Sequence, residues 1–260
     1  EGNGHTISGL DAVLFERMDG ALVSDLTLQG TNLTRNTQKG ALANDIRNSI
    51  VEDIRVKDLT IQNDANQTGG LAGTISNSEI RRISAENLSI RSNNTIGGIA
   101  GQFDGRIMED CIVTGSIEGT SSHQMGSRIG GITGWQGGGI MRRVATKVSI
   151  TAPDPVGNGG IIGGPQSGSA TVESAVSLST GANANRISGW DVLGITSSAY
   201  ELETSDSQSN MNGTNTDRVF AVTEEQTKEK AFYTEILGWS EDVWSFDNLA
   251  ADGGPALNML

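Results

Sequence analysis

The chain has 260 residues, of which 35 are glycine and only 4 % are aromatic, and its formal net charge at pH 7 is −13. This length can bury a substantial core in one or two domains, and the scarcity of large rings indicates a core filled by aliphatic rows. The acidity argues against nucleic acid and an anionic membrane surface as partners, because no stripe of Lys and Arg is available to neutralise phosphates. A solvated surface is the simpler explanation of the charge.

Cys111 is the only cysteine, so no internal disulfide can form. One cysteine fits a cytosolic protein, and equally a bacterial surface protein that avoids cysteine. No apolar run approaches the roughly 18 residues of a membrane span, so membrane insertion is not expected. The chain opens on Glu-Gly rather than Met and shows no signal peptide, which we interpret as a segment of something longer.

A five-residue motif recurs along most of the chain. It reads GGLAG at 69–73, GGIAG at 97–101, GGITG at 130–134 and GGIIG at 159–163, with fainter copies AVLFE at 12–16 and GALAN at 40–44. Successive copies start 28, 29, 28, 33 and 29 residues apart. A fixed period of this size is typical of a solenoid.

Two positions of the motif predict local structure. The third position is always a large aliphatic residue, which predicts one buried stack through the coils: Leu14, Leu42, Leu71, Ile99, Ile132 and Ile161. From the second copy on, the fifth position is Asn once and Gly four times, which predicts a turn with positive φ, since Asn tolerates that region best after Gly. These residues are Asn44, Gly73, Gly101, Gly134 and Gly163.

Two further apolar groups follow each copy of the motif. The first begins at Ile50, Glu79, Ile107 and Ile140, and its buried column contains Cys111, which we expect to act as a small buried hydrophobe. The second is LTI at 59–61, LSI at 88–90 and VSI at 148–150. Three short strands per coil predict a right-handed parallel β-helix, and no helical periodicity competes with this before residue 223.

Pairs of charges precede the buried column of the second group, and their sign alternates from coil to coil. The pairs are Glu52-Asp53, Arg81-Arg82, Glu109-Asp110 and Arg142-Arg143, and Glu173 follows after a slip of two residues. Parallel strands lie about 4.8 Å apart, so each acidic pair is expected between basic neighbours. We interpret the pairs as a charge ladder that opposes a slip of one coil, against chance on a solvated face.

The period fails after residue 180. In TEEQTKEKAFYTEILG, a capping box of Thr223 and Gln226 and a stop at Gly238 predict a helix. Bulky aromatics in the tail are expected to cover the end of the solenoid. The predicted architecture is an all-β solenoid of about six coils over 1–180, an irregular extension over 181–222 and a small C-terminal α/β cap with a helix over 223–260.

The repeated GG[LI]xG followed by a short strand resembles the GLUG motif, and the start GNGHTISGL and the tail AFYTEILGWSEDVWSF resemble the two ends of such arrays. Such arrays occur in the non-catalytic N-terminal region of the immunoglobulin A metalloprotease family and in bacterial adhesins. The resemblance implies an extracellular or cell-surface stalk, spacer or binding module, whose partner is a host protein or glycan. It supplies no catalytic residue, and its motif weakens at 12–16 and 40–44, where glycines are lost.

Neither metal nor nucleophile chemistry is indicated. His5 and His123 lack the spacing of a zinc protease, no G-x-S-x-G elbow occurs, and Cys111 lies in a buried column. We therefore expect no catalytic residues, no cofactor and no metal site, and a monomer. The alternative is a β-helix polysaccharide lyase or hydrolase using Asp104 and the charges at 81–82, 109–110 and 142–143. Trp135 and Trp190, in glycine-rich turns, are candidate partner-binding residues, or plugs for neighbouring loops.

Overall fold

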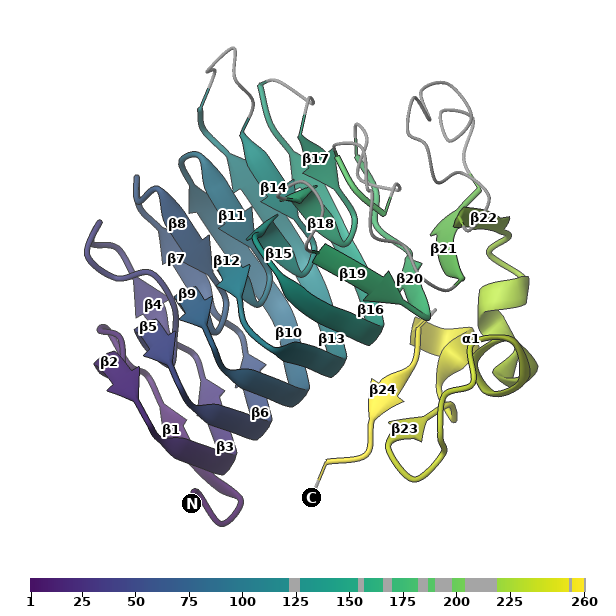
Figure 1. Ribbon diagram of the computed structural model, residues 1–260, viewed down its shortest axis with the longest axis horizontal. Coiled ribbons are helices and arrows are strands. Elements are labelled where there is room, and N and C mark those ends of the chain that lie inside the picture. The colour runs from purple at the N-terminus through teal and green to yellow at the C-terminus, as the bar shows by residue number, and fades with distance from the viewer. Residues whose placement is uncertain are drawn as a thin grey trace.

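The computed structural model describes residues 1–121, 127–153, 157–165, 170–181, 187–189, 198–203, 219–252 and 254–259. These residues are nearly all β, and the strands of the three larger sheets pair in parallel throughout (Figure 1). The predicted all-β class with parallel strands is confirmed.

The largest sheet, sheet A, follows the second apolar group of each coil and runs through the whole molecule. In spatial order its main path is β1 (His5–Ser8), β3 (Leu22–Gln29), β6 (Ile50–Lys57), β10 (Glu79–Ser92), β13 (Ile107–Gly119), β16 (Gly139–Thr151), β20 (Ala175–Ser177), β21 (Ala199–Leu202) and β22 (Val219–Val222). The short strands β4 (Asn32–Leu33), β7 (Thr60–Gln62) and β19 (Ala170–Glu173) pair beside it.

The glycine motif forms two smaller sheets. Sheet B contains the strands that begin at the fourth residue of each motif copy: β2 (Phe15–Asp19), β5 (Ala43–Arg47), β9 (Ala72–Ser76), β12 (Ala100–Asp104), β15 (Thr133–Gln136) and β18 (Ile162–Pro165). Sheet C ends on the first glycine of each motif: β8 (Gln67–Gly69), β11 (Thr95–Gly97), β14 (Arg128–Gly130) and β17 (Asn158–Gly159).

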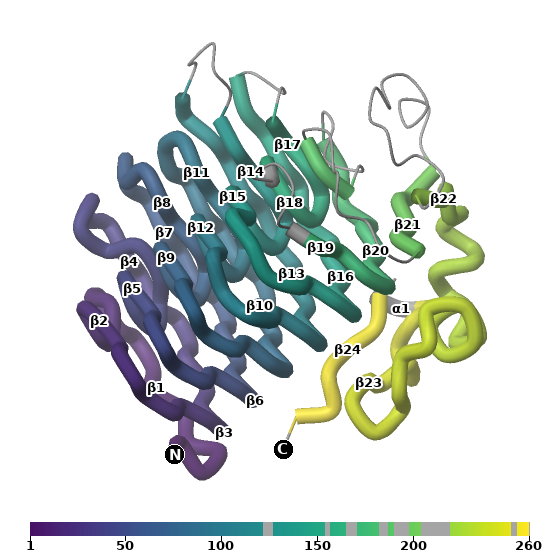
Figure 2. The backbone as a smooth tube through the Cα atoms, in the orientation of Figure 1, coloured from purple at the N-terminus to yellow at the C-terminus, as the bar shows by residue number. Residues whose placement is uncertain are grey.

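The chain visits the sheets in rotation. From β8 it passes from sheet C to sheet B to sheet A and then begins again at β11, and the same order repeats from β14 and from β17. Each strand therefore pairs with the strand one repeat away, as Ile96 of β11 pairs with Thr68 and Ile129. The tube in Figure 2 shows these repeats stacked along the long axis of the molecule.

The aliphatic stack lies in the core between sheets C and B. Leu71, Ile99, Ile132 and Ile161 are each 0 % exposed. The backbone N–H of each of the first three donates to the carbonyl of the next, at 2.9 to 3.0 Å, and Ile161 donates to Ile187. Burial and a continuous ladder of hydrogen bonds thus coincide in one column, and Ile187 extends it beyond the motif copies.

The positive φ predicted at the fifth motif position is wrong. Asn44, Gly73, Gly101, Gly134 and Gly163 are not among the residues with positive φ. A Cβ on Gly101 would lie 2.5 Å from the backbone nitrogen of Thr68, and one on Gly163 would lie 2.4 Å from that of Ile129. Sheets B and C approach backbone to backbone here, so glycine is required for space.

The predicted C-terminal helix is also corrected. A 3₁₀ turn η2 (Gln226–Lys228) and a π-helical turn η3 (Phe232–Ile236) replace a regular α-helix. The capping box forms, because the Thr223 N–H donates to Gln226 Oε1 at 2.9 Å and the Gln226 N–H donates to Thr223 Oγ1 at 3.2 Å. Gly238 has φ of 70° and ends the segment. The π-turn lets the consecutive residues Phe232 and Tyr233 both be buried.

The C-terminal segment packs on the outward side chains of sheet A, whereas the sequence predicts that it covers the end of the stacked repeats. After η3 come β23 (Trp244–Ser245), α1 (Leu249–Asp252) and β24 (Ala256–Leu257), and β23 and β24 form an antiparallel pair. Figure 1 shows this yellow segment beside sheet A, and β24 contacts β10 and β13. An outward apolar column explains the placement: Ile112, Ala145 and Val176 pair in register and bury against the C-terminal aromatics.

Domain boundaries at 180 and 222 stay predictions. Of residues 181–222, the structure describes 181, 187–189, 198–203 and 219–222. Within these residues, β21 and β22 continue sheet A in parallel.

Candidate functional site: the charge ladder and its neighbours

The charge ladder (Glu52, Asp53, Arg81, Arg82, Glu109, Asp110, Arg142 and Arg143) lies on β6, β10, β13 and β16. Arg81 pairs in register with Glu52 on one side and Glu109 on the other, and Glu109 pairs in turn with Arg142. Glu173, for which the sequence suggested a slip, stands opposite Arg142. The first charge of each pair thus forms one column of alternating sign across five strands.

The second charge of each pair has a left-handed backbone. Asp53, Arg82, Asp110 and Arg143 have φ between 50° and 55°, and Asp25 and Ser174 at the column's ends have φ of 55° and 47°. L-residues adopt this region at a cost of roughly 1–2 kcal/mol. The kink interrupts the alternation of side chains, so both charges of a pair point outward before the next residue returns to the core.

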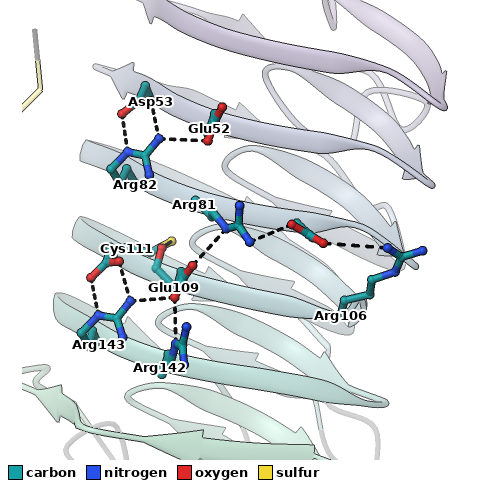
Figure 3. A network of polar contacts seen from close by, with 11 residues as sticks. Glu52, Asp53, Arg81, Arg82, Arg106, Glu109, Cys111, Arg142 and Arg143 are labelled. Carbon is teal, nitrogen blue, oxygen red and sulfur yellow. Dashed lines mark hydrogen bonds and ion pairs between the residues drawn. The ribbon is translucent and has the colours of Figure 1, made fainter. Parts of the chain in front are cut away.

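Two arginines bind the acidic pair of the preceding coil. Arg82 donates from Nε and Nη2 to Asp53 at 2.6 Å each, and from Nη2 to Glu52 at 2.9 Å (Figure 3). Arg143 repeats the arrangement on Asp110, at 2.7 and 2.8 Å, and on Glu109, at 2.6 Å. Hydrogen bonds to Asp53 raise the pKa of Arg82, and those to Asp110 raise the pKa of Arg143.

Glu109 is the centre of the ladder. Its carboxylate contacts Arg81 at 3.0 Å, Arg142 at 2.7 Å and Arg143 at 2.6 Å, and the residue is only 8 % exposed. Burial works to raise the pKa of Glu109, but the hydrogen bonds from Arg142 and Arg143 outweigh it and hold that pKa below its ordinary value. A carboxylate held in this way stays ionised and is a poor proton donor.

Asp110 joins the ladder to the C-terminal segment. The indole Nε1–H of Trp244 donates to Asp110 Oδ1 at 3.0 Å, and Asp110 is 6 % exposed. Trp239 stacks on Trp244, with ring centroids 4.3 Å apart, and donates from its own Nε1 to the Ser174 carbonyl at 3.1 Å. Both indoles therefore bind positions of the left-handed column.

These tryptophan contacts are not predicted by the sequence reasoning. The sequence does hold a signal for them in one outward column of sheet A. This column changes from the polar residues Thr27, Arg55 and Ser84 to the apolar residues Ile112, Ala145 and Val176. Such a change marks the part of the face that another segment covers.

Cys111 and Asp104 complete the candidates for chemistry. Cys111 is fully buried, its thiol donates to the Glu109 carbonyl at 3.3 Å, and burial raises its thiol pKa, so the reactive thiolate does not form. Asp104 accepts a hydrogen bond from the Gln102 side chain and lies on sheet B, away from the ladder. Within the described ranges, no group of three or more His, Cys, Asp or Glu is placed to hold a metal ion.

Trp135 lies on the outer face of sheet B and is partly exposed. The Arg128 guanidinium lies over its ring, 4.1 Å from the centroid, and burial lowers the pKa of Arg128. Trp190, the other predicted partner-binding residue, lies outside the described residues. None of the described helices is long and apolar enough to cross a membrane.

Comparison with known proteins gives a match over the N-terminal 58 residues. No curated protein matches the chain. Residues 1–58, which include β1 to β6 and thus the start of the charge ladder, match the family model of the M26 IgA1-specific metallo-endopeptidase N-terminal region. The resemblance to the immunoglobulin A metalloprotease family is thereby confirmed, and over residues 1–58 the chain is similar to that family's N-terminal region.

Proposed function

We propose that this chain is a non-catalytic module of a secreted protein, built as a right-handed parallel β-helix, that serves as a stalk or as a binding surface. The match of residues 1–58 to an N-terminal region of the M26 family carries the proposal. The rotation of the chain through sheets C, B and A supports the solenoid, because each repeat then packs only on its neighbours. A crystal structure checks the hand, and a left-handed coil would contradict it.

The state of the charge ladder supports the absence of catalysis. A β-helix lyase or hydrolase needs a carboxyl or basic group that is free to exchange a proton with the substrate. In the described structure the ladder's carboxylates are instead held by arginines at 2.6 to 3.0 Å. Separating these pairs would leave charges unpaired, which favours a structural role for them.

A turnover assay tests this function. The chain is incubated with neutral and acidic polysaccharides and with immunoglobulins, and the products are separated by size and mass. We expect no cleavage. Reproducible turnover that is lost in Asp110→Asn or Arg82→Gln would establish the enzymatic alternative and contradict the proposal.

The extracellular setting and the monomeric state belong to the same proposal. M26-like sequence over residues 1–58 supports secretion. A monomer is expected in solution, and light scattering at several protein concentrations measures it. A mass that rises to twice 27.2 kDa would contradict that expectation.

A further inference from the structure

A polar groove lies on the outer face of sheet B, at the N-terminal end of the solenoid. Its volume is about 710 Å³, within the range of ligand-binding clefts. It is lined mainly by groups that form hydrogen bonds, among them Arg17, Asn44, Asp45, Arg47, Gln67 and Thr74. The charge ladder lies on sheet A and takes no part in it.

The groove forms where the glycine motif is broken. Asn44 occupies the position that is glycine in the four later copies. Its side chain accepts from the Lys39 N–H at 2.7 Å and donates to the Thr37 carbonyl at 2.6 Å and to Glu16 Oε2 at 2.9 Å. These bonds hold the segment 36–39 as a wall of the groove, and a glycine could not make them.

Two arginines are oriented at the floor of the groove by one carboxylate. Asp45 Oδ2 accepts from Nε of Arg17 at 3.1 Å and contacts Nε of Arg47 at 2.8 Å, and Thr74 donates to Asp45 Oδ1 at 3.1 Å. Asp45 is thus occupied, with a side chain 15 % exposed, whereas the side chains of Arg17 and Arg47 are 60 % and 47 % exposed. Their terminal N–H groups have no partner in the part of the chain that the structure describes. Two such forks suit a planar anion.

The same face continues to an aromatic ring. Arg17, Asp45, Thr74, Gln102 and Trp135 pair in register on five neighbouring strands, which spans roughly 19 Å at 4.8 Å per strand. Gln67 donates across the row to Gln102. Basic forks therefore lie at one end, amides and a hydroxyl between, and an indole at the other.

We propose that this face binds a carboxylated oligosaccharide laid across the strands of sheet B. Arg17 and Arg47 bind the carboxylate of one sugar, and Gln67 and Thr74 bind hydroxyl groups. At the far end the sugar contacts Trp135 together with the Arg128 guanidinium that lies over its ring. A local pair of exposed arginines selects acidic sugars although the chain as a whole is strongly negative. This inference rests on the proposed function, since it names the ligand of a module that binds without cleaving.

Calorimetric titration with tetragalacturonate tests the inference, and its fully methyl-esterified form is the matched neutral probe. Loss of two charge-assisted contacts should weaken tetragalacturonate binding by about tenfold or more in the double variant Arg17→Gln, Arg47→Gln. The methyl ester should bind the unaltered chain as weakly as tetragalacturonate binds the double variant. Trp135→Ala should weaken both probes.

Arg106→Gln is the control variant, because Arg106 is also highly exposed, at 61 %, but lies outside the groove. Arg106→Gln should bind tetragalacturonate like the unaltered chain. All variants should melt at the same temperature as the unaltered chain. Equal affinity for the acid and its ester, or unchanged affinity in the double arginine variant, would overturn the inference. Mass analysis of the probe separates the two proposals, since cleavage refutes the non-catalytic module and an absence of binding refutes only the glycan.

Discussion

The corner between sheets C and B contains glycine at backbone angles that any residue can adopt. The left-handed column of the charge ladder contains no glycine, although its backbone angles favour glycine. At the corner, Gly98 and Gly101 have ordinary backbone angles, and what excludes a side chain is the backbone of the neighbouring strand. In the ladder column the backbone is left-handed, yet no glycine occupies it. Its six positions are Asp25, Asp53, Arg82, Asp110, Arg143 and Ser174. The comparison shows that the motif glycines are required by crowding, while the positive φ of Asp53, Arg82, Asp110 and Arg143 is accepted by residues that form ion pairs.

The largest effect is expected from Gly98→Ala. Its new Cβ would lie 2.2 Å from the Gly131 carbonyl oxygen and 2.4 Å from Val113 Cγ1, so two coils must separate. We expect a loss of about 3 kcal/mol in the free energy of unfolding, measured by denaturant titration. Gly138→Ala is the control, because a Cβ there meets nothing within 4 Å. Equal losses in the two variants would remove crowding as the reason for the corner glycines.

Reversing the charge of the basic pair Arg81-Arg82 in the charge ladder should have the next largest effect on stability. Replacing Arg81 and Arg82 with Glu brings three acidic pairs together, at roughly 1–3 kcal/mol of repulsion per contact before salt screening. Gln at both positions removes the attraction without adding repulsion and should be the more stable variant. Salt should narrow the gap between their melting temperatures. If both variants melt alike at every salt concentration, the alternation of sign is accidental.

The contact between the ladder and the C-terminal segment is tested by Trp244→Phe. The substitution keeps an aromatic ring in the cluster but removes the N–H that donates to the buried Asp110 carboxylate. A loss of about 1.5–3 kcal/mol is expected, as for a hydrogen bond to a charged group. Trp244→Phe combined with Asp110→Asn measures the coupling of the two residues. Additive losses would show that the indole contributes packing alone.

Substitutions at Arg82 distinguish the cost of its left-handed backbone from the contribution of its ion pairs. At φ of 52°, Arg82→Gly relieves the backbone whereas Arg82→Ala does not, and both lose the contacts to Asp53 and Glu52. The Gly variant should therefore be more stable than the Ala variant by about 1 kcal/mol. Glycine is also preferred to alanine at Gly98, but there the reason is the space that a Cβ would need. An Ala variant of Arg82 as stable as the Gly variant would contradict the left-handed assignment.

The pH dependence of the ladder should be the smallest effect. The pKa of Glu109 is lower in the folded chain than its ordinary value of 4.5, so its stabilisation is present above that pH and is lost as the pH falls through the folded pKa. Unfolding free energies between pH 6 and pH 3 should fall less steeply in Glu109→Gln than in the unaltered chain. Parallel curves would mean that Glu109 contributes nothing to the acid transition.

Much of the parallel-sheet architecture could be predicted, because each repeat of the sequence carries the same apolar and charged positions. The buried row of Leu71, Ile99 and Ile132 follows from one aliphatic column, and the alternation of Glu52, Arg81 and Glu109 follows from the period of about 29 residues. The reason for the corner glycines could not be read in this way. Glycine satisfies both a left-handed turn and a close approach, and only the distance to the next backbone separates the two.

The sequence by itself determined the period, the all-β class, the aliphatic core and the charge alternation, since these depend on neighbours one repeat apart. Tertiary structure alone decided where the C-terminal aromatics lie and how the groove on sheet B is formed. Trp244 reaches Asp110 across 134 positions, and Arg17 and Arg47 converge on Asp45 from neighbouring strands. The contact of Trp244 belongs to no repeat, and the groove forms where Asn44 breaks one, so the chain must fold before either can be recognised.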